Sequence, residues 1–274
     1  MLSLSPLTIL DAAPPDQVVA AASAGFDALG VRVFPAADEL VYPMLGDTPM
    51  MRQTLARLAD TGRQVLDVEL ITLRPTFSID QPLRVLDAGA RLSARFVLVL
   101  GYDADEYRLT DNFAQVCAAA AERGIRPGLE FMMYGAVKTI DDAVRIVEQA
   151  QHPAGAVLVD ALHLRRSGGS PADLAAVPTR RLPYAQLCDA PLEPVWPDES
   201  RARTESRTGR LFPGDGQLPL RELVDAMPLG AALSVEAPVA AMAGQPAQVR
   251  ARRAYAAAVR LLGRPEQSSG NRSG

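Results

Sequence analysis

Short apolar runs of high β-propensity alternate with longer segments of helical periodicity along the whole chain, and this alternation constrains the fold most. The expected strands are residues 2–5, 28–33, 64–71, 96–101, 126–132, 156–160, 184–188 and 232–236. Eight such units suit either a (β/α)8 barrel or a doubly wound open sheet. The open sheet usually carries a glycine-rich phosphate turn, and neither GxGxxG nor GxxxxGK[ST] is present. We therefore predict an α/β fold, a single-domain (β/α)8 TIM barrel over residues 1–264, with a disordered tail at 265–274.

The composition is that of a soluble globular protein, with 48% hydrophobic residues, 22% charged residues and a net charge of −4. No apolar run reaches the ~20 residues of a membrane span, and the amino terminus lacks the basic segment of a secretory signal. The acidic balance and 5% aromatic residues argue against a nucleic-acid groove. Cys117 and Cys188 are expected to be reduced thiols. We expect a cytoplasmic protein with a small-molecule substrate and no nucleic-acid or membrane partner. The sequence leaves open whether the chain forms a homo-oligomer.

The carboxyl ends of four consecutive expected strands each carry an oxygen ligand beside apolar neighbours. These residues are Glu130, Asp160, Gln186 and Glu236. In a barrel these strand ends meet on one face, where the active site forms. Carboxylates buried together are costly unless a cation lies among them, and an all-oxygen shell suits Mn²⁺ or Mg²⁺. The alternative is that these acids cap loops or pair with arginines, but four on successive strands favour a metal centre.

Five stretches of the chain resemble the sugar phosphate isomerase/epimerase family of xylose-isomerase-like TIM barrels. They are GLEFMMYGAVKT, VLVDALHLRRSGGSPADL, YAQLCDAP, LSVEAP and RTGRLFPGDGQLPL, the last of which is similar to the family's R-x-x-PG-[ED]-G loop. The resemblance is best between residues 126 and 238. In the first half it rests on strand order and on phrases such as AGFDALGVRV.

The resemblance implies a divalent cation held by Glu130, Asp160, Gln186 and Glu236, with His163 beside the bound substrate. The sugar epimerases usually have histidine where this chain has Gln186. The same group includes 3-dehydroshikimate dehydratases and inosose dehydratases, and glutamine at this position resembles some of those dehydratases.

Two further residues have side chains that can transfer a proton or act as a nucleophile. Lys138, the lone lysine in an arginine-rich chain, follows Glu130 by eight residues and is either an assisting acid or a solvated loop charge. Cys188 has no histidine motif beside it, so we expect it to have a packing role.

Three arginines are candidates for binding substrate. Arg32 alternates with two valines and is expected to point into the barrel, toward Asp67 and Glu69. The segment 192–216 is long for a barrel loop, and loops of this length without structure are often lids. We therefore predict a lid that is ordered over the bound substrate and excludes water. Within it, Arg207 and Arg210 either bind an anionic substrate group or belong to a solvated basic loop.

We predict a divalent-metal-dependent isomerase or epimerase of a small polyhydroxylated carbonyl compound, a sugar or sugar phosphate. Glu130 or Glu236 would remove a proton next to the carbonyl, with His163 or Lys138 as the assisting acid and the cation stabilising the enediolate. Expulsion of a β-hydroxyl would instead give a dehydratase of the 3-dehydroshikimate or inosose type. A catalytically inactive sugar-binding barrel is the alternative from another class. A nuclease of the related barrel type would need more than two histidines and a basic surface.

Overall fold

Eight parallel strands form a closed barrel in chain order in the computed structural model, which describes residues 1–36, 42–194 and 196–263. The strands are β1 (Leu2–Leu4), β2 (Ala28–Arg32), β3 (Gln64–Leu73), β4 (Phe96–Gly101), β5 (Arg126–Glu130), β6 (Ala156–Asp160), β7 (Tyr184–Leu187) and β8 (Ala232–Val235). The predicted barrel and all of its strands are confirmed. The tail predicted at 265–274 lies outside the described residues.

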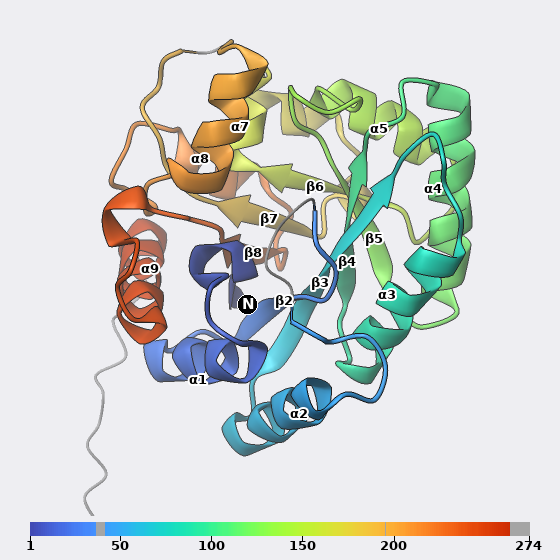
Figure 1. The fold of residues 1–274 in the computed structure, drawn as a ribbon. Coiled ribbons are helices and arrows are strands. Elements are labelled where there is room, and N and C mark those ends of the chain that lie inside the picture. Colours follow the sequence, from blue (N-terminus) through green and yellow to red (C-terminus); the bar gives the residue numbers. More distant parts are fainter. Residues whose placement is uncertain (37–41, 195, 264–274) are drawn as a thin grey trace, which may run out of the picture.

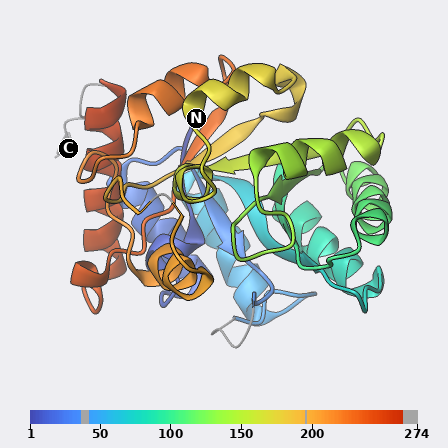
Figure 2. The same cartoon turned by 90° about the horizontal axis from the view of Figure 1, so that it is seen from above.

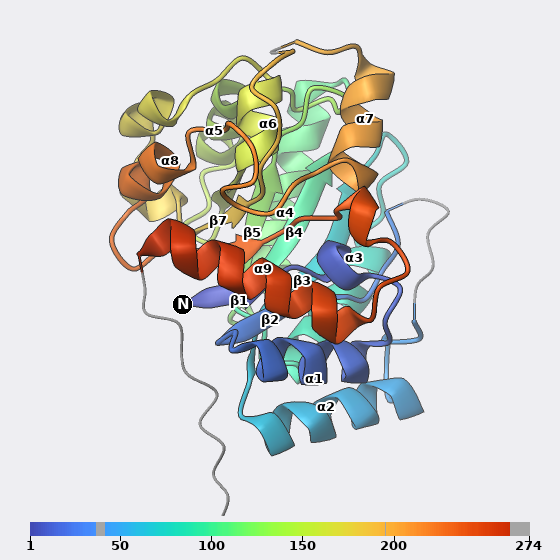
Figure 3. The same cartoon turned by 90° about the vertical axis from the view of Figure 1, so that its left-hand side faces the viewer.

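Helices surround the strands, as Figures 1 and 2 show from two directions. They are α1 (Pro14–Ala24), α2 (Pro49–Thr61), α3 (Asp80–Arg91), α4 (Glu106–Ala121), α5 (Ile140–Gln149), α6 (Ala161–Arg166), α7 (Glu199–Thr208), α8 (Leu220–Ala226) and α9 (Ala247–Leu262). Helix α1 packs against both α2 and α9 on one side of the barrel (Figure 3). Within the described ranges, no helix is long and apolar enough to cross a membrane.

The strands read as continuous apolar runs because both of their faces are buried. In β4, Val97 and Val99 belong to the layer between strands and helices, whereas Phe96, Leu98 and Leu100 fill the barrel interior. This alternation sends every second side chain inward. Inward positions near the carboxyl ends therefore decide what the active-site face presents.

Asp67 of β3 is a buried acid inside the barrel, with 1% of its surface exposed. Neither of its carboxylate oxygens has a hydrogen-bond partner among the described residues. Glycine at position 30 leaves room for it, since a Cβ there would lie 2.7 Å from Asp67 Oδ1. Burial, and next the neighbouring Glu69 carboxylate, raise the pKa of Asp67 well above its usual value.

The segment 192–216 is not the unstructured loop that its length predicts, because it contains α7. The Asp198 side chain caps this helix by accepting a hydrogen bond from the Arg201 backbone N–H at 2.9 Å. Isolated β-bridges from Asp189 to Leu211 and from Gly209 to Val239 tie the flanking residues to the barrel. The helical sequence ESRARTESRT has no apolar stripe, so hydrophobic periodicity does not reveal it.

Candidate active site and metal centre

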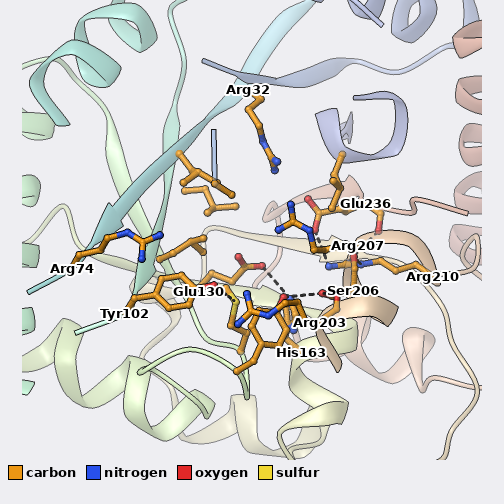
Figure 4. Close-up of a pocket in the computed structure, with 17 residues that line it drawn as sticks. Arg32, Arg74, Tyr102, Glu130, His163, Arg203, Ser206, Arg207, Arg210 and Glu236 are labelled. Carbon is orange, nitrogen blue, oxygen red and sulfur yellow. Dashed lines mark hydrogen bonds and ion pairs between the residues drawn. The ribbon is translucent and has the colours of Figure 1, made fainter. Parts of the chain in front are cut away.

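A cavity of about 280 Å³ opens beyond the carboxyl ends of the strands (Figure 4). Its wall combines two acids, one histidine, two tyrosines and apolar side chains with an unusual number of cations. Five arginines line it, namely Arg32, Arg74, Arg203, Arg207 and Arg210. Guanidinium groups donate hydrogen bonds and accept none, so this lining suits a small anionic ligand.

Glu130, Asp160 and Glu236 form a buried acidic triad on one side of the cavity. One ligand oxygen from each lies within 4.8 Å of the others, which is close enough for a single metal ion. Glu130 ends β5, Asp160 ends β6 and Glu236 directly follows β8. Parallel strands of a barrel bring these ends to one face, so the grouping expected from the sequence is present.

The guanidinium of Arg210 partly neutralises this triad. Its Nη1 lies 2.5 Å from Asp160 Oδ2 and its Nη2 lies 3.1 Å from Glu236 Oε2. Burial opposes ionisation of Asp160, yet the charge of Arg210, and next that of His163, hold the pKa of Asp160 below its usual value. Arg210 therefore contacts the triad itself in this structure, while also lining the cavity.

The ionised forms of the other two acids are poorly compensated by the surrounding charges. Burial, followed by Glu236 and Asp160, raises the pKa of Glu130 well above its usual value. Burial raises the pKa of Glu236 to about 7, although the Arg210 guanidinium lowers it. A second positive charge would relieve both, because a raised carboxylate pKa means that the ionised form lacks compensation.

Gln186 of β7 completes an all-oxygen donor set. Its Nε2 donates to Glu236 Oε1 at 3.0 Å, and its Oε1 is fully buried without a hydrogen-bond partner among the described residues. Such an unsatisfied buried oxygen costs about 1–3 kcal/mol unless a donor or cation meets it. Three carboxylates and one carboxamide oxygen are the donors that Mg²⁺ and Mn²⁺ prefer, so these residues fit a divalent cation.

The glycine-rich loop after α7 is organised by Asp189, which fixes the approach of Arg210. The carboxylate of Asp189 accepts hydrogen bonds from the backbone N–H groups of Gly214 and Leu218, each at 2.9 Å. Gly214 has φ of +88°, a conformation that glycine adopts without strain. The PGDG motif therefore has a structural role, since it anchors the segment that carries the buried arginine.

His163 lies at the cavity wall beside Glu130, with 4.0 Å between His163 Nε2 and Glu130 Oε1. The Asp160 carboxylate accepts a hydrogen bond from the His163 backbone N–H at 2.9 Å, which caps α6 and fixes the histidine relative to the triad. Burial lowers the pKa of His163 to about 4. The imidazole is therefore neutral near pH 7 and retains a basic nitrogen.

Helix α7 forms one wall of the cavity with Arg203, Ser206 and Arg207. Ser206 Oγ and Tyr134 Oη are hydrogen-bonded at 2.8 Å, and the Arg203 guanidinium lies 4.6 Å from the centre of the Tyr134 ring. The Tyr134 ring in turn meets His163 edge-on at 5.7 Å. The segment expected to be a lid thus contributes one wall of the site.

Arg32 points into the barrel as expected and lines the cavity. Its Nη2 lies 2.6 Å from Glu69 Oε2, so the expected pairing with Glu69 is confirmed. The Asp67 carboxylate makes no hydrogen bond to it. Ser5, which follows β1, donates to Glu236 Oε1 at 2.6 Å.

Lys138 and Cys188 lie apart from the cavity lining. The Lys138 ammonium is half exposed and pairs with Glu199 at 3.2 Å, at the start of α7. Its backbone N–H donates to the Asp142 side chain at the start of α5, and Lys138 is not among the residues that line the cavity. Cys117 and Cys188 are both free and buried, as expected, and Cys188 Sγ packs 3.4 Å from Arg210 Nη1.

Sequence reasoning did not identify Arg74, Tyr102, Tyr134, Arg203 and Ser206 as cavity residues. Arg74 and Tyr102 directly follow β3 and β4, so the strand-end rule that found the acids also applies to them. Arg203 and Ser206 depend on α7, which the sequence pattern does not reveal.

The closed eight-stranded barrel defines the class of the fold, and its buried acidic triad could hold a divalent metal ion. Residues 18–260 match the family model described as xylose isomerase-like TIM barrel, and the chain belongs to that family. A solved xylose isomerase-like TIM barrel/4-hydroxyphenylpyruvate dioxygenase fusion protein superposes with a TM-score of 0.76 at 22% identity. The superposition covers 98% of this chain and 45% of that one.

Two curated relatives are named 3-dehydroshikimate dehydratase. The one from Pseudomonas putida is 30% identical over 227 residues, which is 74% of this chain and 32% of that protein. The one from Pseudomonas aeruginosa is 30% identical over 219 residues, with the same coverage of 74% and 32%. The chain therefore spans about a third of the length of these relatives, as the covered share of 32% shows.

Proposed function

We propose that this chain catalyses the metal-dependent dehydration of a cyclic hydroxy-ketone that carries a carboxylate, of the 3-dehydroshikimate type. The observation that carries the proposal is the 30% identity to the Pseudomonas putida dehydratase over 227 residues. The arginine-lined cavity beside the acidic triad supports it, because that cavity suits a small anion. The isomerase or epimerase favoured from the sequence has support only at the level of the family.

Glu130, Asp160 and Glu236, together with Gln186 Oε1, are the residues that would hold the cation. When bound, a divalent cation supplies Lewis acidity toward the carbonyl and hydroxyl oxygens of the substrate. Glu130 and Glu236 of this set line the same cavity as His163, so a substrate held at the cation would lie beside the imidazole.

His163 takes the proton from the carbon next to the carbonyl. Its imidazole is neutral because burial lowers its pKa to about 4, and it lines the cavity. The proton then passes to the β-hydroxyl, whose bond to carbon breaks so that the group leaves as water, and a carbon–carbon double bond forms. One proton-transfer group is sufficient for this elimination.

Epimerisation requires a second group that returns a proton to the opposite face of the substrate. Figure 4 shows Arg32 on the side of the cavity opposite His163. A guanidinium has no basic nitrogen at physiological pH and does not exchange protons with carbon. Arg32 therefore cannot be that second group, and epimerisation would require Glu130 or Glu236, which also line the cavity, to exchange the proton.

Metal-loaded protein incubated with 3-dehydroshikimate tests the proposal, with the aromatic product followed by its absorbance. His163→Asn should lower kcat by about 10²–10⁴-fold, the usual contribution of a proton-transfer group, without loss of metal. His152→Asn is the matched control, since His152 lies outside the cavity lining and bonds to the backbone of Ala154. Absence of turnover by the unaltered protein, or full activity of His163→Asn, would refute the proposal.

A further inference from the structure

Two of the cavity arginines differ from the others in how they are held. The guanidinium carbon of Arg74 lies 5.3 Å from the centre of the Tyr102 ring, and that of Arg203 lies 4.6 Å from the Tyr134 ring. Neither forms an ion pair with a carboxylate of the described residues. Stacking on an aromatic ring orients a guanidinium and leaves its edge N–H groups available for an anion.

Arg74 lies on the side of the barrel opposite most of the metal-ligand set. It directly follows β3, and Tyr102 directly follows β4, whereas the acidic triad extends from β5 to β8. In a closed ring ordered β1 to β8, β3 and β4 lie across from β7 and β8. Figure 4 shows Arg74 and Tyr102 on one side of Glu130, with Glu236 and Arg210 on the other side.

Apolar side chains line the cavity near Arg74. Leu70 of β3, Leu98 and Leu100 of β4 and Met132 after β5 all contribute to the wall. Such a surface accommodates the face of a carbon ring, and the polar groups at the two ends fix its orientation. The cavity is thus built for a flat ring with oxygen substituents at one end and a negative charge at the other.

We propose that Arg74 binds the carboxylate of the substrate and so selects ring acids over neutral polyhydroxylated sugars. This inference rests on the proposed function and deepens it. A carboxylate placed between Glu130 and Glu236 would be repelled. Arg74 lies on the other side of Glu130 from Glu236 (Figure 4), and its guanidinium forms no ion pair with a carboxylate of the described residues. Pro75 follows Arg74 and restricts its backbone to extended conformations, which helps to hold the side chain over Tyr102.

Arg203 is the comparison residue for this assignment. It lies on α7 above Tyr134, whose ring contacts His163, and so belongs to the side of the cavity where proton transfer occurs. A carboxylate bound there would turn the ring's ketone and hydroxyl groups away from the triad. Arg74, and not Arg203, is therefore expected to determine the preference for an acid.

The test compares two probes that differ by one carboxylate. Loss of water and rearrangement convert 3-dehydroshikimate into 3,4-dihydroxybenzoate, and catechol is the same diol without the carboxylate. Calorimetric titration of the metal-loaded full chain should show 3,4-dihydroxybenzoate bound about 10–100-fold more tightly than catechol. In Arg74→Ala that preference should fall to less than about threefold, with catechol affinity unchanged, and Arg74→Lys should recover part of it.

Arg84→Ala is the matched control, because Arg84 is exposed on α3 and outside the cavity lining. An undiminished preference in Arg74→Ala, equal loss of affinity for both probes, or a loss of preference confined to Arg203→Ala would overturn the assignment. Turnover is not needed for these titrations. A protein that binds both probes but never dehydrates 3-dehydroshikimate would refute the proposed function and still decide the role of Arg74.

Discussion

Replacement of Arg210 by methionine should be strongly destabilising in the absence of metal. The Arg210 side chain is 2% exposed and lies 2.5 Å from Asp160 and 3.1 Å from Glu236. Methionine keeps much of the volume and removes the charge, so both carboxylates lose their buried cationic partner. Removal of one partner from a buried ion pair costs about 3–5 kcal/mol. For a domain of this size that corresponds to a fall in Tm of roughly 6–20 °C.

Thermal melts of metal-free protein near pH 8 measure this loss, with Arg203→Met as the matched control. Arg203 lies on the same segment and lines the same cavity, but it is exposed and stacks on Tyr134. Its replacement should cost no more than about 1 kcal/mol. Saturating Mn²⁺ should recover part of the Tm of Arg210→Met, because a cation in the triad replaces the missing charge.

The loss in Arg210→Met should also shrink as the pH falls. Without the guanidinium, the folded-state pKa of Asp160 rises above its unfolded value, so ionisation of Asp160 destabilises the fold progressively at higher pH. A fall in Tm of less than about 2 °C at pH 8, or a loss that neither Mn²⁺ nor acid reduces, would refute this electrostatic account.

Variants at three further residues test neighbouring parts of the structure. Gln186→Ala should weaken Mn²⁺ binding by about 1–3 kcal/mol in calorimetry, while Gln186→His should retain metal and shift preference toward Zn²⁺; unchanged Mn²⁺ affinity of the alanine variant would exclude Gln186 as a ligand. Asp67→Asn should gain Tm relative to the unaltered protein as the pH rises from about 5 to about 8, because the raised folded-state pKa of Asp67 makes its ionisation destabilising. A difference in Tm between Asp67→Asn and the unaltered protein that does not change with pH would contradict this. Lys138→Met should leave kcat within about twofold, since Lys138 is exposed in a surface ion pair; a large loss of kcat would instead support the role of assisting acid, one of the two alternatives that the sequence leaves open.

The strands were predictable because burial on both faces leaves continuous apolar runs in the sequence. Residues with oxygen donors lie at or near the ends of four of these strands. Because a barrel's active face lies at the carboxyl ends, the sequence alone predicts that Glu130, Asp160, Gln186 and Glu236 lie together. In the structure, Glu130, Asp160 and Glu236 form one buried cluster, and Gln186 donates a hydrogen bond to Glu236. For these residues, the pattern of each strand in the sequence and the closed barrel predict the same grouping.

Helix α7 was not predictable in this way. It buries only Ala202 and Ser206, so its sequence contains no apolar stripe from which a helix could be predicted. Its position depends on the Asp198 cap and on the contact of Ser206 with Tyr134. The pairing of Arg210 with Asp160 joins residues fifty positions apart. Such a contact follows from the path of the chain around the barrel and leaves no periodic signal in the sequence.

The dependence of dehydration on bound metal tests the central claim most directly. Protein stripped with a chelator is titrated with Mn²⁺ or Mg²⁺, and metal content and turnover of 3-dehydroshikimate are measured on the same samples. The account predicts negligible turnover without metal, and full turnover once one divalent cation is bound per chain at the site of Glu130, Asp160 and Glu236. Undiminished turnover in protein shown to contain no metal would contradict it.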